Sequence, residues 1–144
     1  MKKHTLIETL YDEEQHAYVV TIGTDIGEFT GATQCREEDY KHEAKYFGFM
    51  LAEIKANIEY AKAKRNYWEA QIKALSSFWK NMEGTRSYDA NAYWVKKIHM
   101  AIEEAKNKRK YWANEITQLK QNYYMRVVSV DAASKNLKRK GIKL

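Results

Sequence analysis

Two arginines, Arg65 and Arg109, occupy positions that apolar residues would normally fill on the face of a long helix. A guanidinium on such a face needs a partner or a route to water, because burying an unpaired charge is costly. Two of them close together would bind an anion such as a phosphate or a carboxylate through charge-assisted hydrogen bonds. We therefore take Arg65 and Arg109 as the leading candidates for a ligand-binding site.

A structural explanation of these arginines stays open beside the ligand-binding one. Their heads could reach solvent while their stems cover neighbouring tryptophans, or they could pair with carboxylates on the same helices. In the ligand-binding alternative, Trp68 and Trp112 flank the arginines and offer rings for stacking. The acidic residues placed for pairing are Glu59, Glu69 and Glu103.

Aromatic and polar residues gather near the break between two predicted helices. Aromatic rings can stack on a base and asparagine can hydrogen-bond its edge, but the same residues could form a hydrophobic cap at the end of a hairpin. Phe78, Trp79 and Asn91 are the ligand-binding candidates among them. Arg126 is a further candidate, with simple solvation next to Lys120 as its alternative. The whole group comprises Phe78, Trp79, Asn81, Arg86, Tyr88, Asn91, Tyr93 and Trp94.

The histidines and the cysteine form no recognisable catalytic or metal-binding pattern. The four histidines are scattered along the chain, and Cys35 has no partner at a known spacing. The glycines at 23 and 27 flank what reads as a hairpin turn and not a phosphate-cradling loop. We therefore predict no enzymatic activity, no cofactor and no metal ion.

The two arginines are positioned by a pair of related helices. From about residue 38 to 126, seam residues recur at alternating spacings of four and three, which is typical of a coiled coil. Residues 58–68 align with residues 102–112 at an offset of 44, and eight of the eleven positions are identical. A repeated helix with a short connection folds back as an antiparallel hairpin. Folding about residues 83–89 would pair residues whose numbers add to roughly 170, so that Arg65 faces Ala105 and Arg109 faces Ala61.

Residues from about 5 to 34 carry strand signals. Runs of β-branched and aromatic residues are interrupted by polar turns at 12–15 and 23–27. The predicted fold class is α+β: a three-stranded antiparallel meander followed by a long antiparallel helical hairpin with related halves. We expect the 144 residues to form one domain, with a basic tail from about 127 to 144.

The charge balance favours anionic partners without choosing among them. Lys+Arg 25 against Asp+Glu 19 gives a net charge of +6, and part of the excess lies in the last ten residues. A single cysteine cannot form an intramolecular disulfide, and no apolar run is long enough for a signal peptide or a membrane span. The expected location is the cytoplasm, with no membrane partner.

A resemblance to known proteins is carried by residues 29–35 (Phe-Thr-Gly-Ala-Thr-Gln-Cys), the acidic run at 37–39, and a helix that enters through Gly48 and Ala52-Glu53. In these residues and in layout the chain resembles the Thoeris anti-defence family of bacteriophages. The resemblance implies an N-terminal antiparallel sheet, two long C-terminal helices and assembly into homo-oligomers. It also implies sequestration, without cleavage, of a cyclic ADP-ribose signal made by bacterial immune enzymes in the host cell.

Three functional hypotheses follow from these observations. The first is a non-enzymatic, oligomeric protein that captures a cyclic ADP-ribose-like or cyclic nucleotide signal and so blunts host defence. The second is a nucleic-acid-binding or protein-binding inhibitor of a bacterial defence enzyme, in which the basic tail would contact phosphates. The third is a structural or adaptor oligomer whose aromatic seam contacts another protein.

Overall fold

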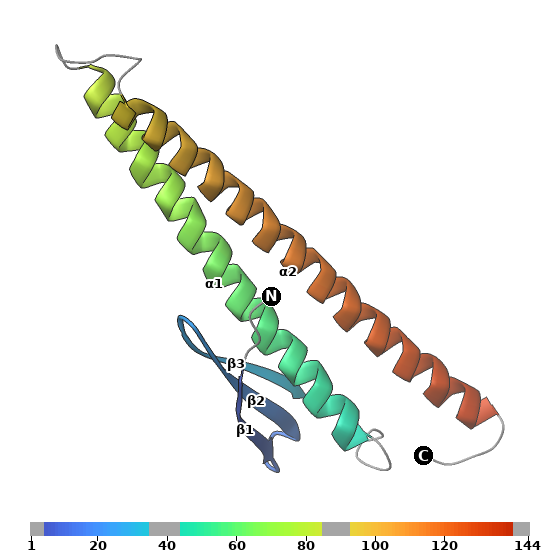
Figure 1. Cartoon of the computed structure of the whole chain (residues 1–144). Helices are drawn as coiled ribbons and strands as arrows, with labels where there is room; N and C mark the ends of the chain where they lie inside the picture. The colour runs from blue at the N-terminus through green and yellow to red at the C-terminus, as the bar shows by residue number, and fades with distance from the viewer. Residues whose placement is uncertain (1–4, 35–43, 85–92, 140–144) are drawn as a thin grey trace. The chain divides into compact units, whose positions relative to one another are not determined.

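The computed structural model describes residues 5–34, 44–84 and 93–139 (Figure 1). Three strands, β1 (Thr5–Asp12), β2 (Ala17–Thr24) and β3 (Gly27–Gln34), precede two long helices, α1 (Ala44–Glu83) and α2 (Tyr93–Arg139). The predicted α+β class is confirmed. The chain forms two compact units, which we name the sheet unit (Met1–Tyr60 with Ile116–Leu144) and the hairpin unit (Ala61–Glu115).

The sheet is an antiparallel meander in the order β1-β2-β3. On its inner face, Tyr18 lies opposite Thr33 and Val20 opposite Gly31, while a bulge between Leu6 and Glu8 shifts the register of β1. The alternation of apolar and polar residues along β2 explains this arrangement, because successive side chains of a strand point to opposite faces. Val20 and Ile22 are therefore buried, at 1% and 0% exposure.

Both turns of the meander are built by short-range side-chain hydrogen bonds. The Asp12 carboxylate accepts from the backbone amides of Glu14 at 3.0 Å and Gln15 at 3.3 Å. In the second turn the Thr24 hydroxyl donates to the carbonyl oxygen of Gly27 at 2.7 Å. Gly27 has φ 132°, a backbone conformation that residues with a Cβ atom rarely adopt. The predicted turns at 12–15 and 23–27 are confirmed.

Within the sheet unit, α1 packs on the inner face of β2 and β3 (Figure 1). Two glycines allow this close approach: a Cβ on Gly31 would overlap the backbone of Ala52 and Ala56, and one on Gly48 would overlap the ring of Tyr18. The ring of Tyr18 in turn meets Phe49 edge-on, with centroids 4.7 Å apart. The core of the sheet unit therefore depends on small residues where the helix backbone crosses the strands.

A hydrogen bond ties the β2–β3 turn to α1. The hydroxyl of Tyr60, whose side chain is only 9% exposed, donates to Asp25 Oδ1 at 2.7 Å. Replacing Tyr60 by phenylalanine removes this bond and leaves the ring contact with Phe29 in place. We expect the free energy of unfolding to fall by about 1–2 kcal/mol, the range for a hydrogen bond to a charged acceptor. Urea denaturation measures this loss, and an unchanged midpoint would contradict the bond.

Asp25→Asn is the matched control, because the amide keeps an oxygen in the position of Oδ1 and can still accept from Tyr60. We expect it to lose less stability than Tyr60→Phe.

The helix ends differ from the sequence-based boundaries. The described part of α1 begins at Ala44. Residues 35–43, with Cys35, the acidic run and the predicted helix start at about residue 38, lie outside the described residues. α2 continues to Arg139, so most of the predicted basic tail is helical in its backbone. Residues 127–139 contain no proline or glycine to end the helix, and the next glycine is Gly141. Neither helix, over its described length, has a stretch apolar enough to cross a membrane.

Candidate anion-binding site

Two side-chain contacts define the register of α1 against α2 in the hairpin unit. Lys64 Nζ lies 5.7 Å from the centroid of the Trp112 ring, and the rings of Trp79 and His99 are 4.3 Å apart. The residue numbers of these pairs add to 176 and 178, so the helices are antiparallel. The predicted sum of roughly 170 for facing residues is therefore wrong, and the helices are shifted against one another by about seven residues relative to that prediction.

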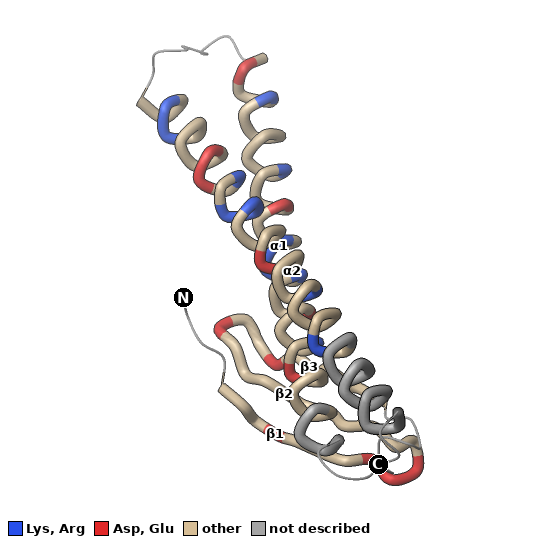
Figure 2. The backbone as a smooth tube through the Cα atoms, turned by 90° about the vertical axis from the view of Figure 1, so that its right-hand side faces the viewer, with Lys and Arg blue, Asp and Glu red and all other residues tan. Residues whose placement is uncertain are grey.

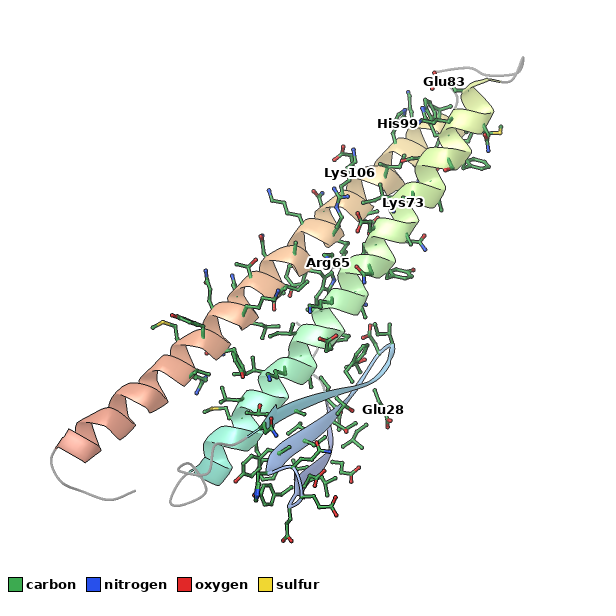
Figure 3. All side chains as sticks on the ribbon, turned by 180° about the vertical axis from the view of Figure 1, so that it is seen from behind. Glu28, Arg65, Lys73, Glu83, His99 and Lys106 are labelled. Carbon is green, nitrogen blue, oxygen red and sulfur yellow. The ribbon has the colours of Figure 1, made fainter. Side chains whose placement is uncertain are left out.

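The observed register gives the arginines new neighbours. Arg65 lies level with Trp112, and Arg109 lies level with Trp68, instead of the predicted Ala105 and Ala61. Arg65 is on the side of α1 that faces α2 (Figure 3). Because Arg109 is level with a position three residues from Arg65, the two arginines are separated by about 4.5 Å along the helix axes. The structure therefore brings the four seam residues into neighbouring layers.

The two Arg-Trp pairs are related by a local two-fold axis. Arg65 and Trp68 in α1 correspond to Arg109 and Trp112 in α2 at the repeat offset of 44. In an antiparallel pair of equivalent helices the axis passes where equivalent residues are level, which is between residues 66 and 67 of α1. Each arginine is thus level with the tryptophan of the other repeat.

Neither arginine has a carboxylate partner among the side chains that the structure describes. Both are partly buried. The guanidinium of Arg65 donates to Asn66 Oδ1 at 3.5 Å, which is at the outer limit of a hydrogen bond. The expected pairing with Glu69 or Glu103 is not formed within this described region. The positive charge at the seam is therefore uncompensated by nearby acidic side chains.

The indole of Trp68 adds an unsatisfied donor to the same layers. Its Nε1 is buried and has no hydrogen-bond partner. An indole N–H can only donate, so this group is available to an acceptor oxygen of a bound molecule. Lys64, over the Trp112 ring, contributes a further positive charge beside the arginines.

The chemistry of this cluster is that of a site for an oxyanion. Guanidinium and indole groups offer only donors, and phosphate or carboxylate oxygens are the acceptors that match them. The flat rings of Trp68 and Trp112 can stack on a planar group attached to the anion. No cluster of three possible metal ligands occurs in the described part of the chain.

Phe78 and Trp79 lie apart from the arginines. Both belong to α1 and not to a loop, and Trp79 is fourteen residues from Arg65, which is about 21 Å along a helix. Phe78 is 51% exposed, whereas Trp79 packs against His99. Asn91 lies outside the described residues. The structure does not bring Phe78 or Trp79 into the Arg-Trp cluster.

Arg126 belongs to the sheet unit. Its Nε donates to Asn122 Oδ1 at 3.0 Å, and its Nη1 donates to Met50 Sδ at 2.8 Å. Nearby, Lys55 Nζ is 5.3 Å from the centroid of the Tyr123 ring. The recorded contacts of Arg126 thus tie α2 to α1 in that unit.

Lys64 was missed in the sequence-based selection of site residues. The available signal was its identity with Lys108 in the aligned repeat, immediately before each arginine.

Comparison of the chain with protein-family models, with curated proteins and with solved structures gives no match.

Proposed function

We propose that this chain is a non-enzymatic protein that binds and sequesters a small anionic ligand of the nucleotide type at Arg65, Arg109 and Trp68. The buried Trp68 N–H without an acceptor carries the proposal, because it lies level with an arginine that also has no anionic partner. Three donors and no acceptor fit a phosphate better than a neutral solute. Tryptophan rings in the adjacent layers offer stacking surfaces for a base.

The biological role that we propose is capture of a cyclic ADP-ribose-like or cyclic nucleotide immune signal by a bacteriophage protein in the host cytoplasm. This role rests on the resemblance of residues 29–53 to the Thoeris anti-defence family. The Arg-Trp cluster supports the ligand class, and it lies outside the stretch that carries the resemblance.

Native mass spectrometry with a ligand panel tests the proposal. The panel contains cyclic dinucleotides, ADP-ribose isomers, inorganic phosphate and short oligonucleotides, each added separately to the full chain. We expect a nucleotide-type compound to be retained with its mass unchanged after prolonged incubation, because the protein binds and does not cleave it. Retention is expected to weaken with added salt, since the contacts are ionic.

The alternatives give different results in the same experiment. Binding of oligonucleotides alone would replace the proposal with the nucleic-acid-binding hypothesis. A bound compound that leaves with altered mass would show catalysis and overturn the non-enzymatic assignment. Retention of no member of the panel would contradict the ligand class.

A further inference from the structure

The sheet carries one sign of charge. Residues 5–34 contain six acidic residues and no lysine or arginine. Figure 2 shows these positions along the strands and their turns. Such a surface repels acidic molecules and attracts basic ones. The six are Glu8, Asp12, Glu13, Glu14, Asp25 and Glu28.

The acidic sheet also exposes an apolar edge. β1 is an edge strand, and Leu6, Ile7 and Leu10 on it are 53%, 48% and 52% exposed. An edge strand with large apolar side chains is a template for association, and natural proteins normally protect it with lysine, with proline or with a covering element. Between Thr5 and Asp12 there is neither lysine nor proline.

The hairpin unit has the opposite charge. Its described residues, 61–84 and 93–115, contain eleven basic and five acidic residues, a net charge of +6 against −6 for the sheet. In α2, Lys106, Lys108 and Lys110 are exposed. Two exposed apolar side chains lie on the same helix, Met100 at 65% and Tyr111 at 41%.

We propose that the β1 edge of the sheet is an interface with a second copy of this chain, whose α2 covers it over residues 100–111. Charge complementarity identifies the occupant, because the chain itself carries both an acidic, apolar strand and a basic helix with exposed apolar residues. Each copy carries both surfaces, so the sheet of either copy can contact the helix of the other. Arg109 lies within this stretch of α2 but is partly buried, and the contact is assigned to the exposed residues Met100, Lys106, Lys108, Lys110 and Tyr111. Arg65 and Trp68 lie on α1, so the interface is argued separately from the proposed function.

A charge-swap experiment tests the interface. The sheet variant carries Glu8→Lys, Asp12→Lys and Glu14→Lys, and the helix variant carries Lys106→Glu, Lys108→Glu and Lys110→Glu. Sedimentation velocity of the full chain measures the assembly, and circular dichroism confirms that each variant is folded. We expect the wild type to be at least dimeric. It should dissociate as the salt concentration rises from about 0.05 M to about 0.5 M, because added salt screens the surface charges at the interface. Each variant alone should be monomeric.

Mixing the two variants decides the nature of the contact. In a mixed dimer both contacts pair opposite charges again, so a 1:1 mixture should recover the wild-type sedimentation coefficient. A wild type that is monomeric at all concentrations would overturn the proposal. So would variants that assemble as the wild type does, or a mixture that stays monomeric. The control, Lys73→Glu with Lys80→Glu on α1, should assemble normally, and its dissociation would contradict the choice of α2.

Discussion

Replacing Gly31 by alanine is expected to lower the free energy of unfolding by about 3 kcal/mol or more, the upper range for overpacking a well-filled core. A Cβ at this position would overlap the carbonyl oxygen of Ala52 and the amide nitrogen of Ala56, and would lie 2.9 Å from Lys55 Cβ. Backbone atoms cannot rotate away as a flexible side chain can. The helix must therefore move off the sheet, and α1 would lose its contact with β3. Urea denaturation followed by circular dichroism measures the loss.

Gly84→Ala is the matched control for this substitution. Gly84 follows the end of α1, and a Cβ there would meet its nearest atoms at 3.9 Å, which is ordinary contact. We expect its unfolding midpoint to stay within experimental error of the wild type. If Gly31→Ala unfolds at the same urea concentration as Gly84→Ala, the packing of α1 on β3 is not as described.

The elements were predictable from the sequence because each carries a strong local signal. β-branched runs with polar turns specify the meander, and the four-three spacing specifies the helices. Gly31 and Gly48 gave no comparable signal, because each is required by a partner distant in sequence: Gly31 in β3 approaches the backbone of α1, and Gly48 in α1 approaches the ring of Tyr18 in β2. A long-range contact of this kind has no period that one segment can reveal.

The register of the hairpin was not predictable from the spacing of seam residues. Its error of about seven residues corresponds to two helical turns, so the same residues still face the partner helix. Arg65 accordingly lies on the side of α1 that faces α2, but the neighbours predicted for Arg65 and Arg109 were wrong. The register follows from contacts between the helices, Lys64 with Trp112 and Trp79 with His99, which no spacing within one helix reveals.

The repeat explains why the candidate site has paired residues. Two equivalent helices that pack antiparallel are related by a two-fold axis, whatever their register. The Arg-Trp pair of one helix therefore has an equivalent pair on the other helix, related to it by this axis. The Trp68 donor breaks this symmetry, because its Nε1 is buried without a hydrogen-bond partner and the Nε1 of Trp112 is not in that state. Sequence identity between the repeats could not indicate this difference, which arises from packing.

Replacing both Arg65 and Arg109 by glutamine is expected to weaken binding of the nucleotide-type ligand by about 100-fold or more. A hydrogen bond between a charged donor and an anion contributes about 1.5–3 kcal/mol. Each loss of about 1.4 kcal/mol raises the dissociation constant tenfold, so losing two such bonds raises it by about 100-fold or more. Because the two arginines are equivalent about the local axis, each single variant should lose a similar part of the affinity. Isothermal titration with the compound retained in native mass spectrometry measures the three affinities.

The double variant also separates ligand binding from a structural role of the arginines. Neither arginine has a carboxylate partner in the described region, so removing their charges should leave the unfolding temperature unchanged or raise it. Lys73→Gln, an exposed lysine on the same helix, is the control and should bind the ligand as the wild type does (Figure 3). A double variant that loses stability but binds with wild-type affinity would show that the guanidinium stems serve packing, and would remove the seam from the binding site.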